Sequence, residues 1–322
     1  MYSVRTMLGR FCLLVVLSLQ ASCITVNLVE PVGPVQEVQL SGTGEGKVLV
    51  LDLSGVISSQ DKDGLMPQPN MLALFKEELT KASKDDKIKA VVVRINSPGG
   101  TVTASDILYH ELREFKLKKK IPVIASMMDV AASGGYYLAM AADSILVHPS
   151  TVTGSIGVIM LTVNARGLLE KVGVEANAIT SGPRKDMGSP FRVMTAEERG
   201  IFQSVIDSFY HRFLAVVQEG RPNLSSEQIK KLADGRIYSG DQAKAVGLID
   251  EIGYLDDAIE MAKKKAGLTE ARVVTYGRRG EYQNNIYSRL FGTSSGMTGF
   301  ANLDLLSMVR GGTPQFMYLW MP

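Results

Sequence analysis

Short apolar runs rich in β-branched residues recur along the chain, separated by segments with the periodicity of amphipathic helices. Runs of this length, bounded by polar and turn residues, predict buried strands. Because strands and helices alternate and the strands are almost wholly apolar, the pattern predicts an α/β fold with a mainly parallel sheet covered by helices. The predicted strands lie at residues 47–53, 88–95, 122–127, 144–148 and 174–180.

Four helices are predicted from their apolar faces and their N-terminal signals. Apolar residues recur on one face across residues 71–82 and again across residues 108–115. A Ser or Thr followed three residues later by Glu or Gln has the sequence of a capping box and marks the start of a helix. This signature occurs at Thr195 with Glu198, before a predicted helix that runs towards Gly220, and at Ser225 with Gln228.

The first 23 residues have the features of an export signal. Two arginines precede an apolar run at residues 11–19, and small residues follow it before Cys23. The run is shorter than the about 20 residues that a transmembrane helix needs. The sequence LQASC resembles the end of a bacterial lipoprotein signal, in which the Cys is lipidated, although Gln20 stands where an aliphatic residue is usual. We therefore expect the protein to be exported. Three outcomes remain open: Cys23 is lipidated, residues 1–23 stay as an N-terminal anchor, or the signal is cleaved and the protein is secreted.

Three further segments follow the signal. Residues 24–46 hold two prolines and a stretch of Ser, Gly, Thr and Glu, which predicts a linker. The α/β pattern occupies residues 47–270. Residues 271–322 are rich in Gly, Ser, Asn and Arg and predict a C-terminal extension. Its apolar end, residues 316–320, is expected either to pack on the body of the protein or to form an arm that docks on a neighbouring subunit or in a groove.

Composition narrows the possible functions. A chain of 322 residues that is 45% hydrophobic can bury a sizeable core. The net charge of +2 gives no basic field for nucleic acid. Cys12 and Cys23, the only cysteines, both lie in the first 23 residues, which excludes a disulfide framework and a cysteine metal site. His110, His148 and His211 lie far apart without the HExxH spacing, so hydrolytic chemistry is expected to proceed without zinc.

A first candidate for chemistry is the sequence NSPGG at residues 96–100, directly after a predicted strand. Two glycines where a strand turns into a helix let backbone N–H groups approach a ligand closely. The N-terminus of the following helix adds the positive end of its dipole, so the turn suits a phosphate or an oxyanion. The P-loop and dinucleotide-binding patterns are absent from the sequence. The alternative is a tight Pro-Gly turn that binds nothing.

A second candidate is Ser133, in the sequence DVAASGGYY at residues 129–137. A serine between small residues at a strand-to-helix turn presents its hydroxyl at a helix N-terminus, as a nucleophile elbow does, although the GxSxG pattern is absent. The N–H of Gly134 would lie beside the oxyanion formed on a carbonyl that Ser133 attacks. The alternative is an N-cap, the commonest role of a serine that precedes a helix.

A serine nucleophile needs a base. His148 lies in an apolar run and is expected to be a strand-end histidine, while His110 and His211 lie mid-helix among solvated charges. The remaining candidate is Lys185, in a Gly- and Pro-containing loop at residues 181–188. The alternative is an ordinary solvated lysine.

Together these motifs resemble those of the signal peptide peptidase A family of serine proteases, whose fold is that of Clp protease and crotonase. The resemblance runs from about Lys47 to Gly267, which is most of the chain after the signal, and its blocks stand in the family's order. It implies an α/β, Clp protease/crotonase-like fold with mainly parallel β-sheets and flanking helices. The blocks are NSPGG at 96–100, DVAASGGYYLAMAAD at 129–143, TGSIGV at 153–158, SGPRKDMGSPFR at 181–192 and GRIYSGDQAKAVGLID at 235–250.

The resemblance also implies roles for individual residues of a Ser/Lys protease domain at residues 47–270. A lysine accepts a proton only when it is neutral, and the ordinary pKa of its amine is about 10.4. Burial, with Arg184 as a like-charged neighbour, is expected to favour the neutral amine. The residues carried over are Ser133 as the nucleophile, Lys185 as the general base, Gly99 or Gly100 with Gly134 as the oxyanion hole, and Ser155 as the residue that orients the lysine.

The activity implied is that of a membrane-associated bacterial serine endopeptidase that hydrolyses cleaved signal peptides and similar apolar peptides. Its catalytic domain is expected on the extracytoplasmic side of a membrane, held there by a lipid or an N-terminal anchor, with no cofactor. Some family members carry two tandem copies of this unit and build the site from a Ser in one copy and a Lys in the other. This chain has one copy, so Ser133 of one subunit is expected to meet Lys185 of its neighbour in a homo-oligomeric ring, unless the site is completed within one chain.

Two other functions fit the same fold. One is a crotonase-type acyl-CoA enzyme, because that fold also binds an oxyanion with paired backbone N–H groups; the export signal and Lys185 argue against it. The other is a non-catalytic scaffold, against which the intact Ser133 and Lys185 argue.

Overall fold

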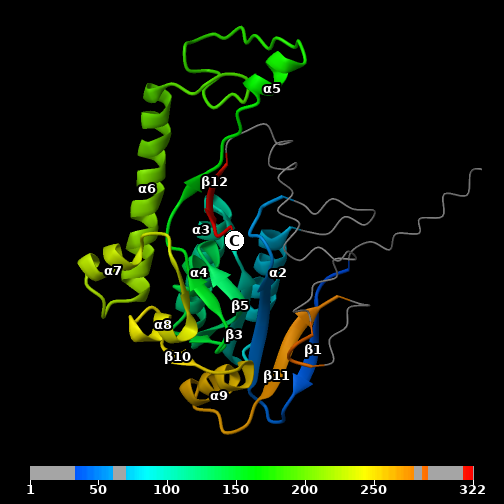
Figure 1. Ribbon diagram of the computed structural model, residues 1–322. Helices are drawn as coiled ribbons and strands as arrows, with labels where there is room; N and C mark the ends of the chain where they lie inside the picture. The colour runs from blue at the N-terminus through cyan, green and yellow to red at the C-terminus, as the bar shows by residue number, and fades with distance from the viewer. Residues whose placement is uncertain (1–32, 61–69, 279–284, 289–314, 322) are drawn as a thin grey trace, which may run out of the picture.

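One nine-stranded sheet forms the centre of the computed structural model, which describes residues 33–60, 70–278, 285–288 and 315–321 (Figure 1). Its strands, in chain order, are β1 (Gln36–Ser41), β2 (Lys47–Ser54), β3 (Ile88–Ser97), β5 (Val123–Ala132), β6 (Ser144–Val147), β7 (Val152–Gly154), β9 (Ile237–Ser239), β10 (Glu251–Ile252) and β11 (Arg272–Gly277). They lie in the order β1-β11-β2-β3-β5-β6-β10, with β7 paired to β5 and β9 paired to β7. All pairs are parallel except β1 with β11 and β7 with β9, which confirms the predicted α/β fold with a mainly parallel sheet.

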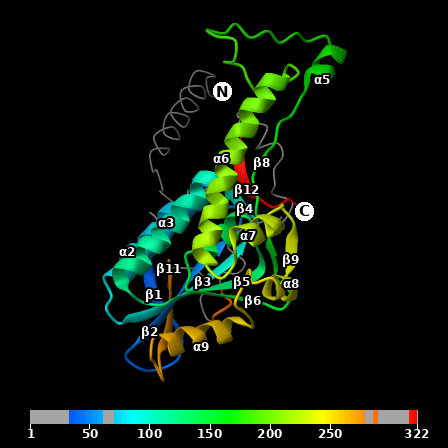
Figure 2. The ribbon, with the colours of Figure 1, turned by 90° about the vertical axis from the view of Figure 1, so that its left-hand side faces the viewer.

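Helices cover both faces of this sheet. Successive strand residues point to opposite faces, so Leu49 and Leu51 pack with Phe75 and Leu108 on one side, in a large apolar cluster. Val48, Val50 and their neighbours pack against a single helix on the other side (Figure 2). The helices are α2 (Met71–Ser83), α3 (Val102–Lys119), α4 (Gly134–Ala139), α5 (Arg166–Lys171), α6 (Ala196–Gly220), α7 (Ser226–Leu232), α8 (Gly240–Ala245) and, alone on the second face, α9 (Leu255–Lys265).

The four helices predicted from the sequence are confirmed as α2, α3, α6 and α7. Both predicted capping boxes are formed, with Thr195 capping α6 and Ser225 capping α7. The first four predicted strands correspond to β2, β3, β5 and β6. Because these segments bury one face or both, their apolar periodicity predicts them correctly.

The chain also forms a small second sheet. It consists of β4 (Gly99–Thr101), β8 (Ile159–Met160) and β12 (Phe316–Leu319), with β12 in the middle and antiparallel to both neighbours. Met317, Tyr318 and Leu319 are buried. The apolar end of the C-terminal segment therefore packs on the body of the protein, as one of the two sequence expectations states.

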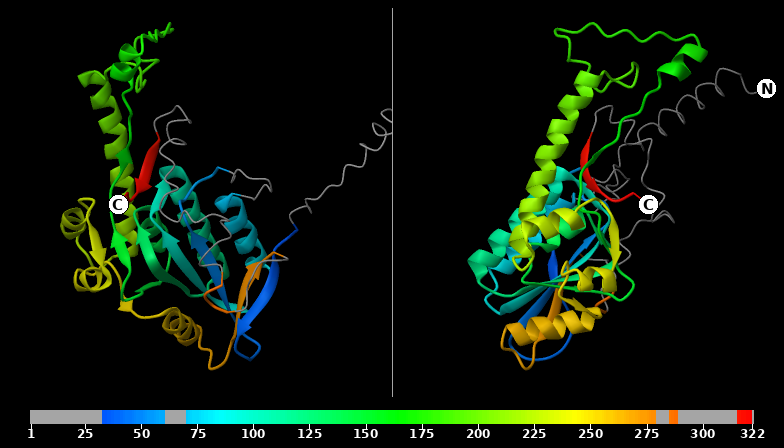
Figure 3. Two further views of the ribbon diagram at one scale, coloured as in Figure 1. Left: turned by 45° about the vertical axis from the view of Figure 1, so that its right-hand side comes forward. Right: turned by 60° about the vertical axis from the view of Figure 1, so that its left-hand side comes forward.

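Residues 161–195, which we call the arm, project away from the body (Figure 3). They lead from β8 through α5 to the N-terminus of α6, and the views in Figures 1 to 3 all place them at the far end of α6 from the sheet. The strand predicted at residues 174–180 is wrong. These residues form no strand and are all exposed, because on the arm they have no neighbouring strand to pair with.

The limits of the domain differ from the sequence prediction. Strand β1 falls within residues 24–46, predicted as a linker, and β11 falls within residues 271–322, predicted as an extension. The two strands pair with each other, and β11 also pairs with β2. Each is therefore part of the main sheet.

No helix in the described ranges is long and apolar enough to span a membrane. The predicted export signal, residues 1–23, and the candidate lipidation site Cys23 lie outside the described residues.

Candidate active site

Ser133 occupies the sharp turn between β5 and α4 in an unusual backbone conformation. Its φ of 51° and ψ of −112° lie in a region that residues other than glycine seldom adopt. Two backbone hydrogen bonds fix the turn: the N–H of Ser133 donates to the Gly154 carbonyl at 2.8 Å, and its carbonyl accepts from the Tyr137 N–H at 2.8 Å. A local conformation of this kind is what a nucleophile elbow requires.

The hydroxyl of Ser133 is left without a hydrogen-bond partner. Its Oγ is buried and unbonded within the described part of the chain, and the side chain makes no capping bond to α4. A buried hydroxyl normally finds a partner. The N-cap alternative for Ser133 is therefore wrong, and the hydroxyl is free to act on another group.

Gly99 and Gly134 bring their backbones into contact beside Ser133. A methyl group on Gly99, whose φ is 100°, would lie 2.7 Å from the nitrogen of Gly134. A methyl group on Gly134 would lie 2.4 Å from Oγ of Ser105. Backbone atoms exclude a side chain at Gly99, and the Ser105 hydroxyl opposes one at Gly134. The two candidate oxyanion-hole residues lie at the same corner of the fold.

Gly100 and Ser97 complete this corner. A methyl group on Gly100 would lie 1.9 Å from the carbonyl oxygen of Ile57, which in turn accepts the N–H of Thr101 at 2.9 Å. The N–H of Gly99 donates to Oγ of Ser97 at 3.1 Å. Ser97 and Ile57 could not be recognised as parts of this corner from the sequence, because a serine at a strand end and an isolated apolar residue carry no specific signal.

Strand β12 lies directly against Gly99, Gly100 and Gly134, which we call the glycine corner. The carbonyl oxygen of Tyr318 would be 2.0 Å from a methyl group on Gly99 and 3.2 Å from one on Gly134. The N–H of Trp320 donates to the carbonyl of Pro98 at 2.9 Å. An extended segment of the chain's own C-terminal region thus runs past the site as the central strand of the small sheet.

The side chain of Tyr318 fills an aromatic pocket. Its ring centroid lies 5.1 Å from that of Tyr137 and 4.7 Å from that of Phe213. Its hydroxyl donates to the carbonyl of Phe209 at 2.8 Å. Burial raises the pKa of Tyr137 and that of Tyr318, so both rings remain uncharged. The pocket therefore suits a large apolar or aromatic residue.

Ser155 lies close to the same turn, directly after β7. Like Ser133 it has a positive φ, 49°, and it is buried. Its N–H donates to the carbonyl of Arg236 at 2.8 Å, while the preceding Gly154 holds Ser133. The structure thus places Ser155 directly after the residue that holds the Ser133 turn.

Lys185 is the one candidate that the structure does not bring to this site. It lies on the arm, exposed, with its N–H bonded to the carbonyl of Gly182 at 3.1 Å. Among the described residues its amine forms no ion pair, and it does not bond to Ser133 Oγ, which has no partner there. Within one chain, the candidate nucleophile and the candidate base are separate.

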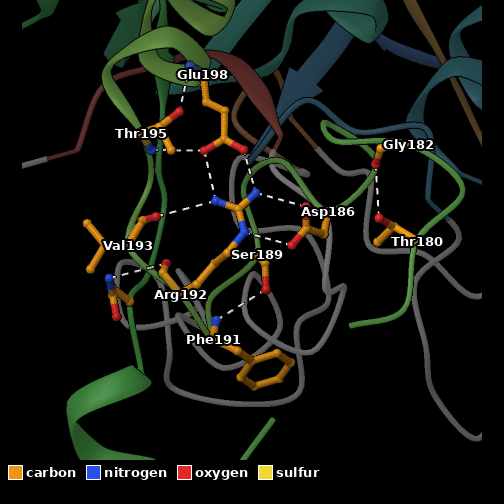
Figure 4. A network of polar contacts seen from close by, with 10 residues as sticks. Thr180, Gly182, Asp186, Ser189, Phe191, Arg192, Val193, Thr195 and Glu198 are labelled. Carbon is orange, nitrogen blue, oxygen red and sulfur yellow. Dashed lines mark hydrogen bonds and ion pairs between the residues drawn. The ribbon is translucent and has the colours of Figure 1, made fainter. Parts of the chain in front are cut away.

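The loop around Lys185 is held by a network centred on Arg192 (Figure 4). The guanidinium donates to both oxygens of Asp186, at 2.7 and 2.8 Å, and to both oxygens of Glu198 in the first turn of α6. These hydrogen bonds from Arg192 hold the pKa of Asp186 below its ordinary value and lower that of Glu198 to about 2. This role of Arg192 could not be recognised from the sequence, because one arginine in a loop forms no pattern.

His148 behaves as a strand-end histidine. It follows β6, and its ring lies 2.8 Å from Oγ of Ser150 and edge-on to Tyr254. In the described ranges no group of three or more His, Cys, Asp or Glu side chains is placed to hold a metal ion.

Two protein-family models match parts of this chain. Residues 115–269 match Peptidase family S49, and residues 68–151 match Clp protease. The chain is 39% identical over 242 residues to a putative signal peptide peptidase SppA of Enterococcus faecium. The aligned residues make up 75% of this chain and 70% of that protein.

Longer relatives match over part of their length. Protease 4 of Salmonella typhi is 37% identical over 193 residues, 60% of this chain and 31% of that protein. The chloroplastic serine protease SPPA of Arabidopsis thaliana is 35% identical over 241 residues, 73% of this chain and 35% of that protein. Among solved structures, a ClpP1 mutant from Listeria monocytogenes is 19% identical, with a TM-score of 0.43, over 65% of this chain and 94% of that one.

Proposed function

This chain belongs to peptidase family S49, and from that premise we propose that Ser133 is its nucleophile, Lys185 its general base, and cleaved signal peptides and similar apolar peptides its substrates. It is a serine-type endopeptidase. The observation that carries the proposal is the state of Ser133: a buried hydroxyl without a partner in the described chain, on a turn with positive φ. Unusual backbone conformations of this kind cluster at active sites.

The small sheet supports a mode of peptide binding. Strand β12 pairs with β4 on one side and with β8 on the other. An extended peptide in the place of β12 could therefore be held between β4 and β8 by main-chain hydrogen bonds. Recognition through the main chain tolerates many sequences, while pockets for alternate side chains select among them. The aromatic pocket that receives Tyr318 is apolar, which is consistent with substrates that have apolar cores.

The proposed reaction proceeds by acyl transfer. Oγ of Ser133 attacks the carbonyl carbon of the scissile peptide bond, and the amine of Lys185 accepts its proton. Negative charge on the carbonyl oxygen is stabilised by backbone N–H groups, that of Gly134 and that of Gly99 or Gly100. The C–N bond then breaks and the leaving amine takes the proton from Lys185. A water molecule attacks the acyl-enzyme, which releases the second peptide and restores Ser133.

Lys185 is proposed to act on a neighbouring subunit. Of the fourteen exposed large apolar side chains in the described ranges, eight lie on the arm, among them Leu168, Val172 and Ile179. An apolar surface of this kind is typical of an interface between proteins. If each arm packs on the next body, one heterologous contact repeats and closes into a ring. Each ring site then holds Ser133 of one subunit and Lys185 of another.

The location of the protein is part of the proposal. We expect the catalytic domain on the extracytoplasmic side of a bacterial membrane, held by a lipid on Cys23 or by residues 1–23 as an anchor. Membrane lipid would then be a partner of the N-terminal segment, and released signal peptides would lie within reach.

Reaction with a fluorophosphonate probe tests the proposal. The purified protein should bind the probe covalently at Ser133 and should cut synthetic signal peptides, with the sites mapped by mass spectrometry. Ser204, an exposed helix serine whose hydroxyl bonds to the Ile201 carbonyl, offers a matched control, and Ser204→Ala should label normally. Failure of the wild-type protein to label would favour the scaffold; thioester hydrolysis without peptide cleavage would favour the acyl-CoA enzyme.

A further inference from the structure

We infer that Arg192 is a positioning residue that fixes the loop carrying Lys185 to the first turn of α6, an inference that rests on the proposed role of Lys185 as the base. Arg192 touches neither Ser133 nor the glycine corner. Its effect on the reaction is exerted through Asp186, the residue that directly follows Lys185 in the chain.

All five N–H groups of the Arg192 guanidinium are used. Nε and one N–H of Nη2 donate to Asp186, and the other N–H of Nη2 donates to Glu198. Nη1 donates to Glu198 at 2.9 Å and to the carbonyl of Val193 at 3.3 Å. A guanidinium presents five donors in a rigid plane, and the ammonium of lysine cannot reproduce this geometry. The bridge therefore requires arginine.

The helix end of the bridge is firmly held. Glu198 is only 3% exposed, and its Oε2 also accepts the N–H of Thr195 at 2.9 Å. The hydroxyl of Thr195 accepts the N–H of Glu198 in return, at 3.2 Å, so the same carboxylate closes the capping box of α6. One side chain thus joins the helix cap to the arginine, and Figure 4 shows Arg192 between the two carboxylates.

The loop end of the bridge has little other support. Between residues 182 and 189 the backbone bonds are short-range turns, from Lys185 to Gly182, from Met187 to Arg184 and from Ser189 to Asp186. A longer connection lies further along the loop, where the N–H of Ala165 donates to the carbonyl of Pro190 at 2.7 Å. On the other flank, Arg184 pairs with Glu197, but both side chains are more than half exposed, and exposed pairs contribute little. The Asp186 side chain is 22% exposed and that of Arg192 32%, which makes their bidentate pair the better-sheltered connection.

The bridge has a second effect on Lys185. Both oxygens of Asp186, the nearest carboxylate in sequence, are occupied by Arg192. Among the described residues, Lys185 consequently has no carboxylate partner. An amine without an ion-pair partner, on a loop whose next residue is held by Arg192, can enter the site of a neighbouring subunit without first breaking an ion pair.

Steady-state kinetics of Arg192→Lys tests the inference. Lysine keeps the positive charge but lacks the planar guanidinium with its five donors. The kcat should therefore fall about 10- to 100-fold while KM stays within about twofold, because a misplaced base slows the chemical step. The variant should stay folded, with the ring size of the wild type. Arg166→Lys is the control: it alters an exposed pair with Glu170 on the same arm and should leave kcat unchanged. Wild-type kcat in Arg192→Lys overturns the inference.

A double-mutant cycle provides a test that does not need the arginine to be changed. Asp186→Asn removes the loop end of the bridge, and Glu198→Gln removes the ionic helix end while glutamine still closes a capping box. Because either change breaks the same connection, the double variant should be no slower than the worse single variant. Multiplicative losses would overturn the inference, and so would wild-type kcat in both single variants.

Lys185→Ala separates this inference from the proposed function. If Lys185→Ala keeps the wild-type rate, the lysine base itself is wrong and the bridge has no catalytic role. If Lys185→Ala is inactive while Arg192→Lys is as active as the wild type, only the positioning role of Arg192 is wrong.

Discussion

The main-chain N–H of Ser133 donates to the carbonyl of Gly154 at 2.8 Å. This bond joins the turn that carries the proposed nucleophile to the strand that leads to Ser155. It is formed by the backbone alone, and neither the Ser133 hydroxyl nor any other bond of its side chain helps to hold the turn in the described structure. The conformation of Ser133 is thus independent of its hydroxyl.

Ser133→Ala should therefore remove activity without unfolding the protein. We expect no peptide hydrolysis and no fluorophosphonate labelling, with a melting temperature close to that of the wild type, because the missing hydroxyl makes no bond. Differential scanning calorimetry alongside a peptidase assay checks this. A loss of more than about 1 kcal/mol of stability, the usual effect of removing an N-cap, would contradict the assignment.

Mixing two inactive variants should restore activity if the site is shared. Ser133→Ala keeps the lysine and Lys185→Ala keeps the serine, so after subunit exchange some neighbouring pairs carry both. In a large ring with random mixing, about a quarter of the sites should recover. Exchange is verified by native mass spectrometry of differently labelled subunits. Complete exchange without activity, or a fully active monomer, would refute the shared site.

Weakening the hold of β12 should increase the activity towards added peptides. Tyr318→Ala loses the ring stacking on Tyr137 and Phe213 and the bond to the Phe209 carbonyl. Strand β12 then competes less with an added peptide for pairing with β4 and β8. The KM for a peptide substrate should fall, by about tenfold if β12 otherwise occupies this position nine-tenths of the time. Tyr287→Ala, at an exposed tyrosine, should leave KM unchanged. An unaltered KM in Tyr318→Ala would show that peptides bind elsewhere.

Gly134→Ala should damage both the fold and the site. The added methyl group would lie 2.4 Å from Oγ of Ser105, and overpacking of this kind destabilises by about 1–3 kcal/mol. Adding Ser105→Ala removes the clashing oxygen and should recover much of the stability. Gly167→Ala, where no atom lies within 4 Å of the new methyl group, is the matched control. Urea unfolding curves measure the differences; equal stability of all variants would mean that this corner tolerates a side chain.

The contribution of Glu198 to stability should depend on pH in a defined direction. Its hydrogen bond with Arg192 lowers the pKa of the carboxyl from 4.5 to about 2. A carboxyl with a lower pKa in the folded state stabilises the fold above its unfolded pKa, and this stabilisation is lost as the pH falls through the folded pKa. The difference in melting temperature between wild type and Glu198→Gln should be constant from about pH 8 to 5 and shrink between about pH 4.5 and 2. A difference that grows on acidification would contradict this.

The sequence predicts the body of the protein well because burial imposes a period on it. Strands β2, β3, β5 and β6 are apolar in nearly every position, and the Thr195 and Ser225 capping boxes are local signals that the structure reproduces. The arm is predicted poorly because its residues are exposed and burial imposes no period on them. Residues 174–180 have the composition of a strand, but a strand forms only beside another, and composition carries no information about neighbours.

The candidate site divides in the same way. The motifs containing Gly99, Ser133 and Ser155 each end a strand of the main sheet, so their meeting follows from the parallel order of β3, β5 and β7. The packing of residues 316–320 on the body was among the sequence expectations, but the Arg192 bridge and the pairing of β12 with β4 and β8 could not be predicted, since both join segments without any shared pattern. Contacts of this kind depend on the three-dimensional path of the chain.

The projection of the arm has a consequence for a newly made copy of this protein. Lys185, the proposed base, lies on the arm, and Ser133, the proposed nucleophile, is buried in the body, so a single chain does not bring the two residues together. If the site is shared between subunits, the protease is inactive when dilution separates its copies and active when they assemble at high density on a membrane surface. Hydrolysis would then rise more steeply than in proportion to the number of copies per unit area, and a cell could set its proteolytic capacity through density alone.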